Sequence, residues 1–172
     1  MNGRMDPGEW LTRGTVWLAL SLYVASEIAA ARRGGESSRA ARWLNTAGCA
    51  AFLAHVAAAF HFYHHWSHAA AYADTARQTA KFSGWNWGGG LYLNYLFALV
   101  WLGDVVWSWA NPNRSLQRPN WMPWIVRCFF LFMMFNGAVV FVHGAIRWLG
   151  LILCFALVVC WWRGHPDPAA HS

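Results

Sequence analysis

Residues 91–110 read LYLNYLFALVWLGDVVWSWA, and this stretch decides the class of fold. Its only charged side chain is Asp104. A helix rises 1.5 Å per residue, so a helix over this range is about 30 Å long, which matches the hydrocarbon core of a bilayer. We therefore expect residues 91–110 to cross a membrane as a single helix.

Similar apolar blocks lie on both sides of this stretch. Hydrophobic residues make up 58% of the 172 residues and charged residues 12%, against about 45–50% and about 25% in soluble domains. The last block is short for a span, so the number of helices is left at four or five. The sequence predicts an all-α, polytopic transmembrane bundle forming one domain over 1–172, with spans at about 14–31, 43–65, 91–110, 123–143 and 148–162.

The second block continues well beyond the length that a bilayer needs. No glycine or proline occurs between Cys49 and Ser83, and alanine is frequent, so no strong helix breaker interrupts this segment. We expect a long second helix that protrudes on the outer side, or becomes an interfacial helix, over about 66–82. The tail at 163–172 contains two prolines and is predicted to be disordered.

Tryptophans mark the ends of the apolar blocks, as indole rings do at the headgroup level of a bilayer. The formal charge is +6, but the basic residues form no dense stripe with interleaved aromatic residues, which excludes a nucleic-acid partner. The lipid bilayer is the expected partner. The tryptophans near block ends are Trp43, Trp66, Trp107, Trp109, Trp121, Trp124, Trp148, Trp161 and Trp162.

The basic residues also predict an orientation, because short cytoplasmic loops carry more of them. With the amino terminus outside, eight lie on the inner side and five on the outer side. This count favours a bacterial cytoplasmic (inner) membrane protein whose second helix ends in the periplasm. The inner set is Arg32, Arg33, Arg39, Arg42, Arg114, Arg118, Arg127 and Arg163; the outer set is Arg4, Arg13, Arg77, Lys81 and Arg147.

Histidines concentrate at the outer end of the second block, where residues 61–68 read HFYHHWSH. On a continuous helix His61, His65 and His68 share one face, and His64 can replace His65 in that set. Imidazoles at such spacing bind zinc, copper or iron. The sequence thus predicts a metal site of His61, His64, His65 and His68. Tyr72, which continues the same stripe, and Asp74, the nearest carboxylate in the sequence, are the expected supporting residues.

Two other interpretations of the histidines are left open. A haem b group could lie between helices, held by His61 and His143 at matched depth, with His55 as a deeper ligand. Alternatively, the histidines are interfacial and have a structural role. Asn94 and Asn136 either orient a histidine or bond across helices.

Ionisable side chains within spans are costly and are usually paired or functional. Asp104 and Arg127 fall at similar depths near the inner ends of the third and fourth spans. We predict an ion pair between them that holds these two helices together. A proton or ion path is the alternative.

The string His61-x-x-His64-His65 resembles one histidine box of the membrane fatty-acid desaturases and hydroxylases. That family builds a di-iron centre from several boxes, and His143 is the only further outer candidate here. The stretch from His61 to Tyr95, with its Trp87-Gly88-Gly89-Gly90 motif, is similar to a group of uncharacterised small bacterial membrane proteins. That resemblance implies no activity.

Three functional hypotheses follow from these patterns. The first is a membrane protein with a transition-metal or haem site at the periplasmic end of the second helix, whose reaction the residues do not name. The second is an accessory or scaffold subunit of a larger membrane complex. The third is a small transporter, which would need a polar path at the midplane. The sequence does not decide whether the chain is an enzyme.

Overall fold

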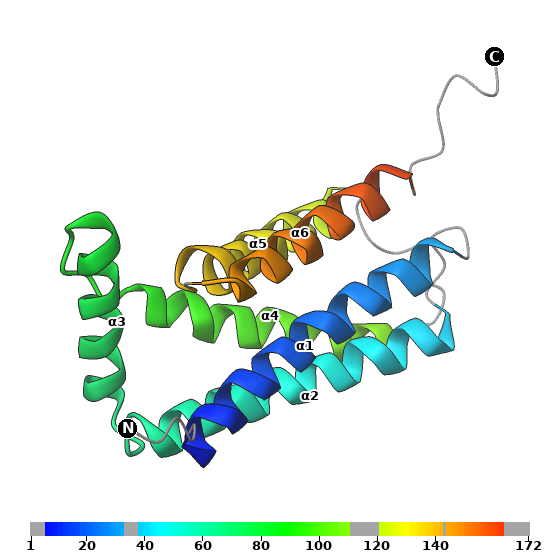
Figure 1. Ribbon diagram of the computed structural model, residues 1–172. Coiled ribbons are helices and arrows are strands. Elements are labelled where there is room, and N and C mark those ends of the chain that lie inside the picture. The colour runs from blue at the N-terminus through cyan, green and yellow to red at the C-terminus, as the bar shows by residue number, and fades with distance from the viewer. Residues whose placement is uncertain (1–5, 33–37, 111–120, 143, 164–172) are drawn as a thin grey trace.

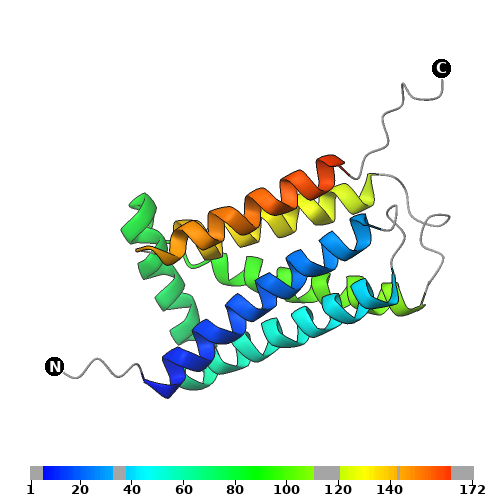
Figure 2. The ribbon, with the colours of Figure 1, turned by 45° about the vertical axis from the view of Figure 1, so that its right-hand side comes forward.

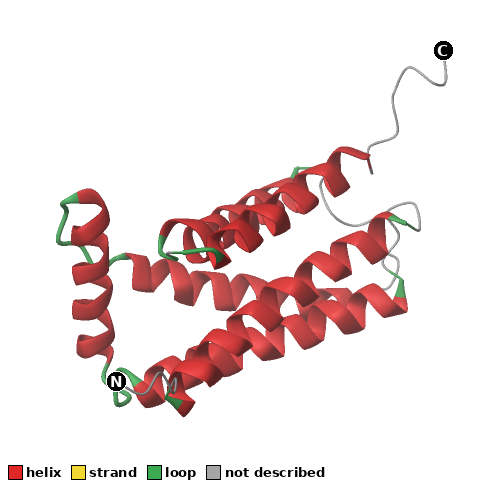
Figure 3. Ribbon diagram, in the orientation of Figure 1, coloured by secondary structure: helices red, strands yellow, loops and turns green. Residues whose placement is uncertain are grey.

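The computed structural model describes residues 6–32, 38–110, 121–142 and 144–163, and all of the regular structure in them is helical (Figures 1 and 3). The apolar composition and the absence of strands in these ranges confirm the all-α class predicted from the sequence. The elements are α1 (Pro7–Ala31), α2 (Arg39–Phe62), α3 (His68–Ser83), α4 (Gly90–Ala110), α5 (Met122–Phe135), the π-helix η2 (Asn136–Val140) and α6 (Ile146–Arg163).

Within the described ranges, four segments are long and apolar enough to cross a membrane: α1, α2, α4, and α5 together with η2. The helix α6 is apolar but shorter. The first helix begins at Pro7, earlier than the predicted residue 14, because proline suits the first turn and Glu9 pairs with Arg13 one turn later (2.8 Å). Length and composition thus support a multi-pass membrane protein.

The long helices run side by side, and α3 crosses one end of them (Figures 1 and 2). The helix α1 packs along α2, α4 also contacts α2, and α5 and α6 form a pair. The ring of Phe82 at the end of α3 contacts Phe141, just after η2 (centroids 6.2 Å apart). We call this end of the bundle the α3 end, and the end where α1 finishes and α2 begins the far end.

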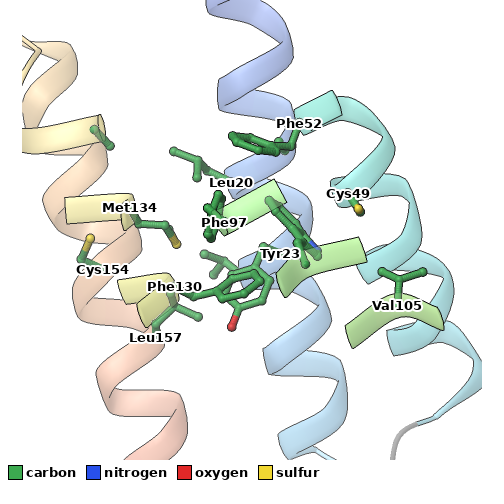
Figure 4. Close-up of a cluster of buried hydrophobic side chains, with 14 of the residues drawn as sticks. Leu20, Tyr23, Cys49, Phe52, Phe97, Val105, Phe130, Met134, Cys154 and Leu157 are labelled. Atoms are coloured by element: carbon green, nitrogen blue, oxygen red, sulfur yellow. The ribbon is translucent and has the colours of Figure 1, made fainter. Parts of the chain in front are cut away.

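Aromatic rings from α1, α4 and α5 meet in the core (Figure 4). Tyr23 of α1 packs on Phe130 of α5 with centroids 4.6 Å apart, and Phe97 of α4 packs on the same ring at 4.7 Å. Trp101 is fully buried beside them, 5.2 Å from Phe130. Such ring pairs contribute about 0.5–1.5 kcal/mol each beyond their buried area. These contacts join α1, α4 and α5 into one bundle.

Of the two forms expected for the second block, the structure has a separate helix over much of 66–82 and not a continuous protruding one. The helix α2 ends at Phe62, and α3 starts at His68 in a new direction. The Ser67 hydroxyl accepts a hydrogen bond from the Ala70 amide (3.2 Å), which caps α3 and stabilises a new helix start. No glycine or proline is needed because His65 and Trp66 themselves adopt left-handed φ angles of 48° and 60°.

The fourth predicted span, 123–143, also ends differently. After Phe135 the helix widens into η2, in which the Phe141 amide donates to the Asn136 carbonyl (3.1 Å). His143, the turn at 111–113 and the predicted disordered tail beyond Arg163 lie outside the described residues.

Candidate functional site

The segment between α2 and α3, residues 63–67, is a tight turn that we call the histidine turn. The Trp66 amide donates to the Phe60 carbonyl (3.0 Å), and the Ser67 amide donates to the His64 carbonyl (2.8 Å). Two successive non-glycine residues, His65 and Trp66, have positive φ angles here. Left-handed conformations of bulky residues are uncommon, and each costs about 1–3 kcal/mol. The turn is therefore locally strained.

The four predicted metal ligands have different surroundings in and around the turn. His61 is exposed on the last turn of α2, against the ring of Phe62 (4.8 Å). His64 is half-buried with its ring 5.6 Å from Phe60, and His65 is exposed. The one-face arrangement expected for a continuous helix is therefore absent. Among the described residues, no three histidine, cysteine or acidic side chains form a group that could hold a metal ion.

His68, the fourth of these histidines, lies within an aromatic cluster at the start of α3. Its Nδ1 atom is hydrogen-bonded to the Tyr95 hydroxyl (3.0 Å), and the two rings are stacked with centroids 5.8 Å apart. Tyr92 contacts both His68 and Tyr72. This cluster connects α3 to the first turns of α4. The second nitrogen of the His68 ring, Nε2, is not part of the hydrogen bond to Tyr95.

A hollow of about 220 Å³ separates the histidine turn from α3. It is lined by Tyr63, His64, Ala70, Ala73, Asp74 and Arg77. It thus brings one imidazole and one carboxylate of the predicted set to the same space. The Asp74 carboxylate also accepts hydrogen bonds from Arg77 and from Gln78, both at 2.9 Å. The Asp74–Arg77 pair is exposed, so it contributes at most about 1 kcal/mol.

The deeper candidate, His55, is half-buried between α2 and α1. Its Nδ1 donates to the Thr12 carbonyl (2.8 Å), because a carbonyl oxygen can only accept. The neighbouring ring is Phe52, 6.0 Å away. His55 therefore connects two helices and does not join the histidine turn. The proposed haem partner, His143, lies outside the described residues.

The two asparagines considered as supporting residues lie apart from the turn. The Asn136 side chain donates to the Phe132 carbonyl one turn earlier in its own helix (2.7 Å). Asn94 is exposed on α4. The hydrogen bond of Asn136 therefore does not involve a histidine.

A second polar region occupies the far end of the bundle. Arg127 of α5 lies 3.3 Å from the Glu27 carboxylate of α1, and the same carboxylate oxygen accepts a hydrogen bond from Trp161 Nε1 of α6 (2.7 Å). The Arg127 guanidinium also lies over the Trp161 ring (5.6 Å). This ion pair connects α1 with α5, and the Trp161 hydrogen bond adds α6. The ion pair predicted between Asp104 and Arg127 stays a prediction.

Asp104 belongs to a group that connects α4 with α2. Its carboxylate accepts a hydrogen bond from Asn45 Nδ2 (3.0 Å), and the Asn45 carbonyl accepts one from Trp101 Nε1 (2.8 Å). Asn45 is buried, and Trp101 is fully buried. The roles of Asn45 and of the two tryptophan donors, Trp101 and Trp161, were not predicted from the sequence, although a lone asparagine in an apolar block is a usable signal.

Comparison of the chain with protein-family models, curated proteins and solved structures found no match. Function is therefore argued from the residues themselves. The far-end groups have their charges and donors paired across helices, which is what a structural role requires. The α3 end combines exposed imidazoles, a carboxylate and a strained turn around a hollow, so it is the better candidate for chemistry.

Proposed function

We propose that this chain is a multi-pass protein of the bacterial cytoplasmic membrane that binds a transition metal ion at the histidine turn. The observation that carries this proposal is that His64 and Asp74 line one hollow beside a turn rich in further imidazoles. Imidazole nitrogen and carboxylate oxygen are both ligands for zinc, copper and iron.

His64 and Asp74 supply the first two ligands in this account. His61 and His65 are exposed neighbours of His64 in the chain, and exposed side chains change rotamer within nanoseconds. In this proposal a change of rotamer at one of them supplies the third ligand. A bound cation would replace Arg77 as the partner of Asp74, which costs little because the ion pair is on the surface.

The strained backbone supports the same assignment. Glycine would occupy the left-handed positions 65 and 66 at lower cost, yet the chain has His65 and Trp66 there. Strain of this kind is typical of binding and catalytic sites, where it fixes a side chain in a working position. A ligand role for His65 would account for a residue that is otherwise unfavourable.

The position of α3 supports a periplasmic location for the proposed site. Since α3 crosses the ends of the spanning helices (Figure 1), we place it along the periplasmic surface as an interfacial helix. The exposed rings of Phe82, Trp85 and Trp87 at its end suit the headgroup region. The excess of arginine in the opposite loops supports this orientation. The metal would then be accessible from the periplasm.

The test is a titration of the purified, chelator-washed protein with Zn²⁺ or Cu²⁺ alone. We expect one ion per chain, with nitrogen hyperfine structure in the electron paramagnetic resonance spectrum of the copper form. His64→Ala should abolish saturable binding, and Asp74→Asn should weaken it by about 10–100-fold. His171→Ala is the matched control, because it removes one imidazole outside the turn.

The other hypotheses predict different results in the same experiment. An accessory subunit binds no stoichiometric metal and co-purifies with a partner. A haem protein shows a Soret band that His64→Ala leaves intact and His61→Ala removes. Equal loss of binding in His64→Ala and His171→Ala would indicate nonspecific capture by histidines, and would refute a site at the turn.

A further inference from the structure

A second hollow, of about 300 Å³, lies between α1 and the segment joining η2 to α6, away from the histidine turn. Its walls are mostly apolar, and one side chain with a charge, Arg13, lines it. The main apolar lining residues are Val16, Trp17, Leu20, Gly137, Ala138 and Phe141.

The hollow lies away from the end at which α1 and α6 are hydrogen-bonded to each other. At the far end the Trp161 indole of α6 donates to Glu27 of α1 (2.7 Å). Toward the α3 end the two helices diverge (Figures 1 and 2). The helix α6 instead packs tightly on η2, where any side chain at position 150 would overlap the Ala138 carbonyl oxygen. The resulting apolar wedge opens among helices long enough to span the bilayer.

Arg13 adds a charge that suits a phosphate. It is six residues from the start of α1, about 9 Å at helical rise, so its long side chain can reach the headgroup level. Its ion pair with Glu9 (2.8 Å) is on the surface, with the arginine side chain 66% exposed. Such a pair contributes at most about 1 kcal/mol, whereas arginine binds phosphate oxygens in a bidentate manner.

We infer that this wedge binds an anionic phospholipid, with one acyl chain between α1 and η2 and the phosphate at Arg13. In a membrane, lipid acyl chains fill an apolar hollow of this kind, and the exposed Arg13 guanidinium favours an anionic headgroup. This site is independent of the proposed metal site, since none of its lining residues belongs to the histidine turn.

The test is native mass spectrometry of the delipidated full-length protein with phosphatidylglycerol or phosphatidylcholine of identical acyl chains. We expect one tightly retained phosphatidylglycerol, preferred over phosphatidylcholine by about fivefold, the contribution of one arginine near a membrane surface. Arg13→Gln should remove the preference. Gly137→Leu should weaken both lipids, because nothing lies within 4 Å of a Cβ there and the added side chain would fill the wedge.

Lys81→Gln is the control, because Lys81 is an exposed basic residue of α3 that lines neither hollow. It should bind both lipids as the natural chain does. Equal retention of the two lipids by the natural chain would overturn the inference. So would loss of the preference in Lys81→Gln to the same extent as in Arg13→Gln, or unchanged lipid binding in Gly137→Leu.

Discussion

Replacement of Glu27 tests whether the far-end ion pair holds the bundle together. In the structure the Glu27 carboxylate accepts from Trp161 (2.7 Å) and lies 3.3 Å from Arg127, so one side chain joins three helices. The two charged side chains are 18% and 31% exposed, between a surface pair and a fully buried one. Loss of Glu27 should therefore cost more than a surface pair and leave Arg127 partly uncompensated.

The magnitude follows from the two contacts. A hydrogen bond between membrane helices contributes about 0.6–2 kcal/mol. Breaking a buried pair costs about 3–5 kcal/mol and a surface pair at most about 1 kcal/mol. We expect Glu27→Ala to lower the free energy of unfolding by about 2–4 kcal/mol. Glu27→Gln should lower it by about 1–2 kcal/mol, because the amide oxygen still accepts from Trp161.

The assay is reversible unfolding in mixed micelles, with a double-mutant cycle that combines Glu27→Gln and Arg127→Gln. A coupling energy of about 1 kcal/mol is expected. Glu9→Gln is the matched control, since Glu9 pairs with Arg13 on the surface (2.8 Å), and it should change stability by less than about 1 kcal/mol. The reasoning is refuted if the coupling energy is zero, or if Glu27→Ala is no more destabilising than Glu9→Gln.

Three further predictions use the same unfolding assay. Gly150→Val should destabilise the chain by about 1–3 kcal/mol, because its side chain would overlap the Ala138 carbonyl oxygen, whereas Gly103→Ala, with nothing within 4 Å, should be neutral or stabilising. Asn45→Leu removes two hydrogen bonds between α2 and α4 and should cost about 1–3 kcal/mol; an unchanged stability would contradict the structural role. His65→Gly should raise stability by about 1 kcal/mol by relieving a φ of 48°, yet weaken zinc binding in a parallel titration, and a variant that binds zinc normally would exclude His65 as a ligand.

The helical class could be predicted from the sequence because bilayer thickness imposes a simple length rule. The predicted span at 91–110 matches α4 to within one residue, and the predicted span at 14–31 falls within α1. The break after Phe62 could not be predicted in the same way. It depends on a serine cap and on two residues in an unfavourable conformation, and no helix-propensity argument favours left-handed His65 or Trp66.

The candidate site illustrates the same limit. The clustering of histidines can be seen in the sequence, but the orientation of each side chain depends on the turn. The expectation that His61, His65 and His68 share one helix face required a continuous helix, and the helix is interrupted after Phe62. The pairing of Glu27 with Arg127 was also not predicted. The sequence indicates which residues lie at the same depth in the membrane, but it does not indicate which helices are neighbours. Asp74 was named only as the nearest carboxylate, and folding of α3 places it with His64.

The most direct test of the metal proposal is elemental analysis of the protein purified from membranes without chelator, beside His64→Ala prepared identically. The account predicts about one zinc, copper or iron ion per natural chain and less than about a tenth of that in the variant. A natural chain that is folded, free of transition metal and unable to take it up on titration would contradict the account and direct attention to partner proteins.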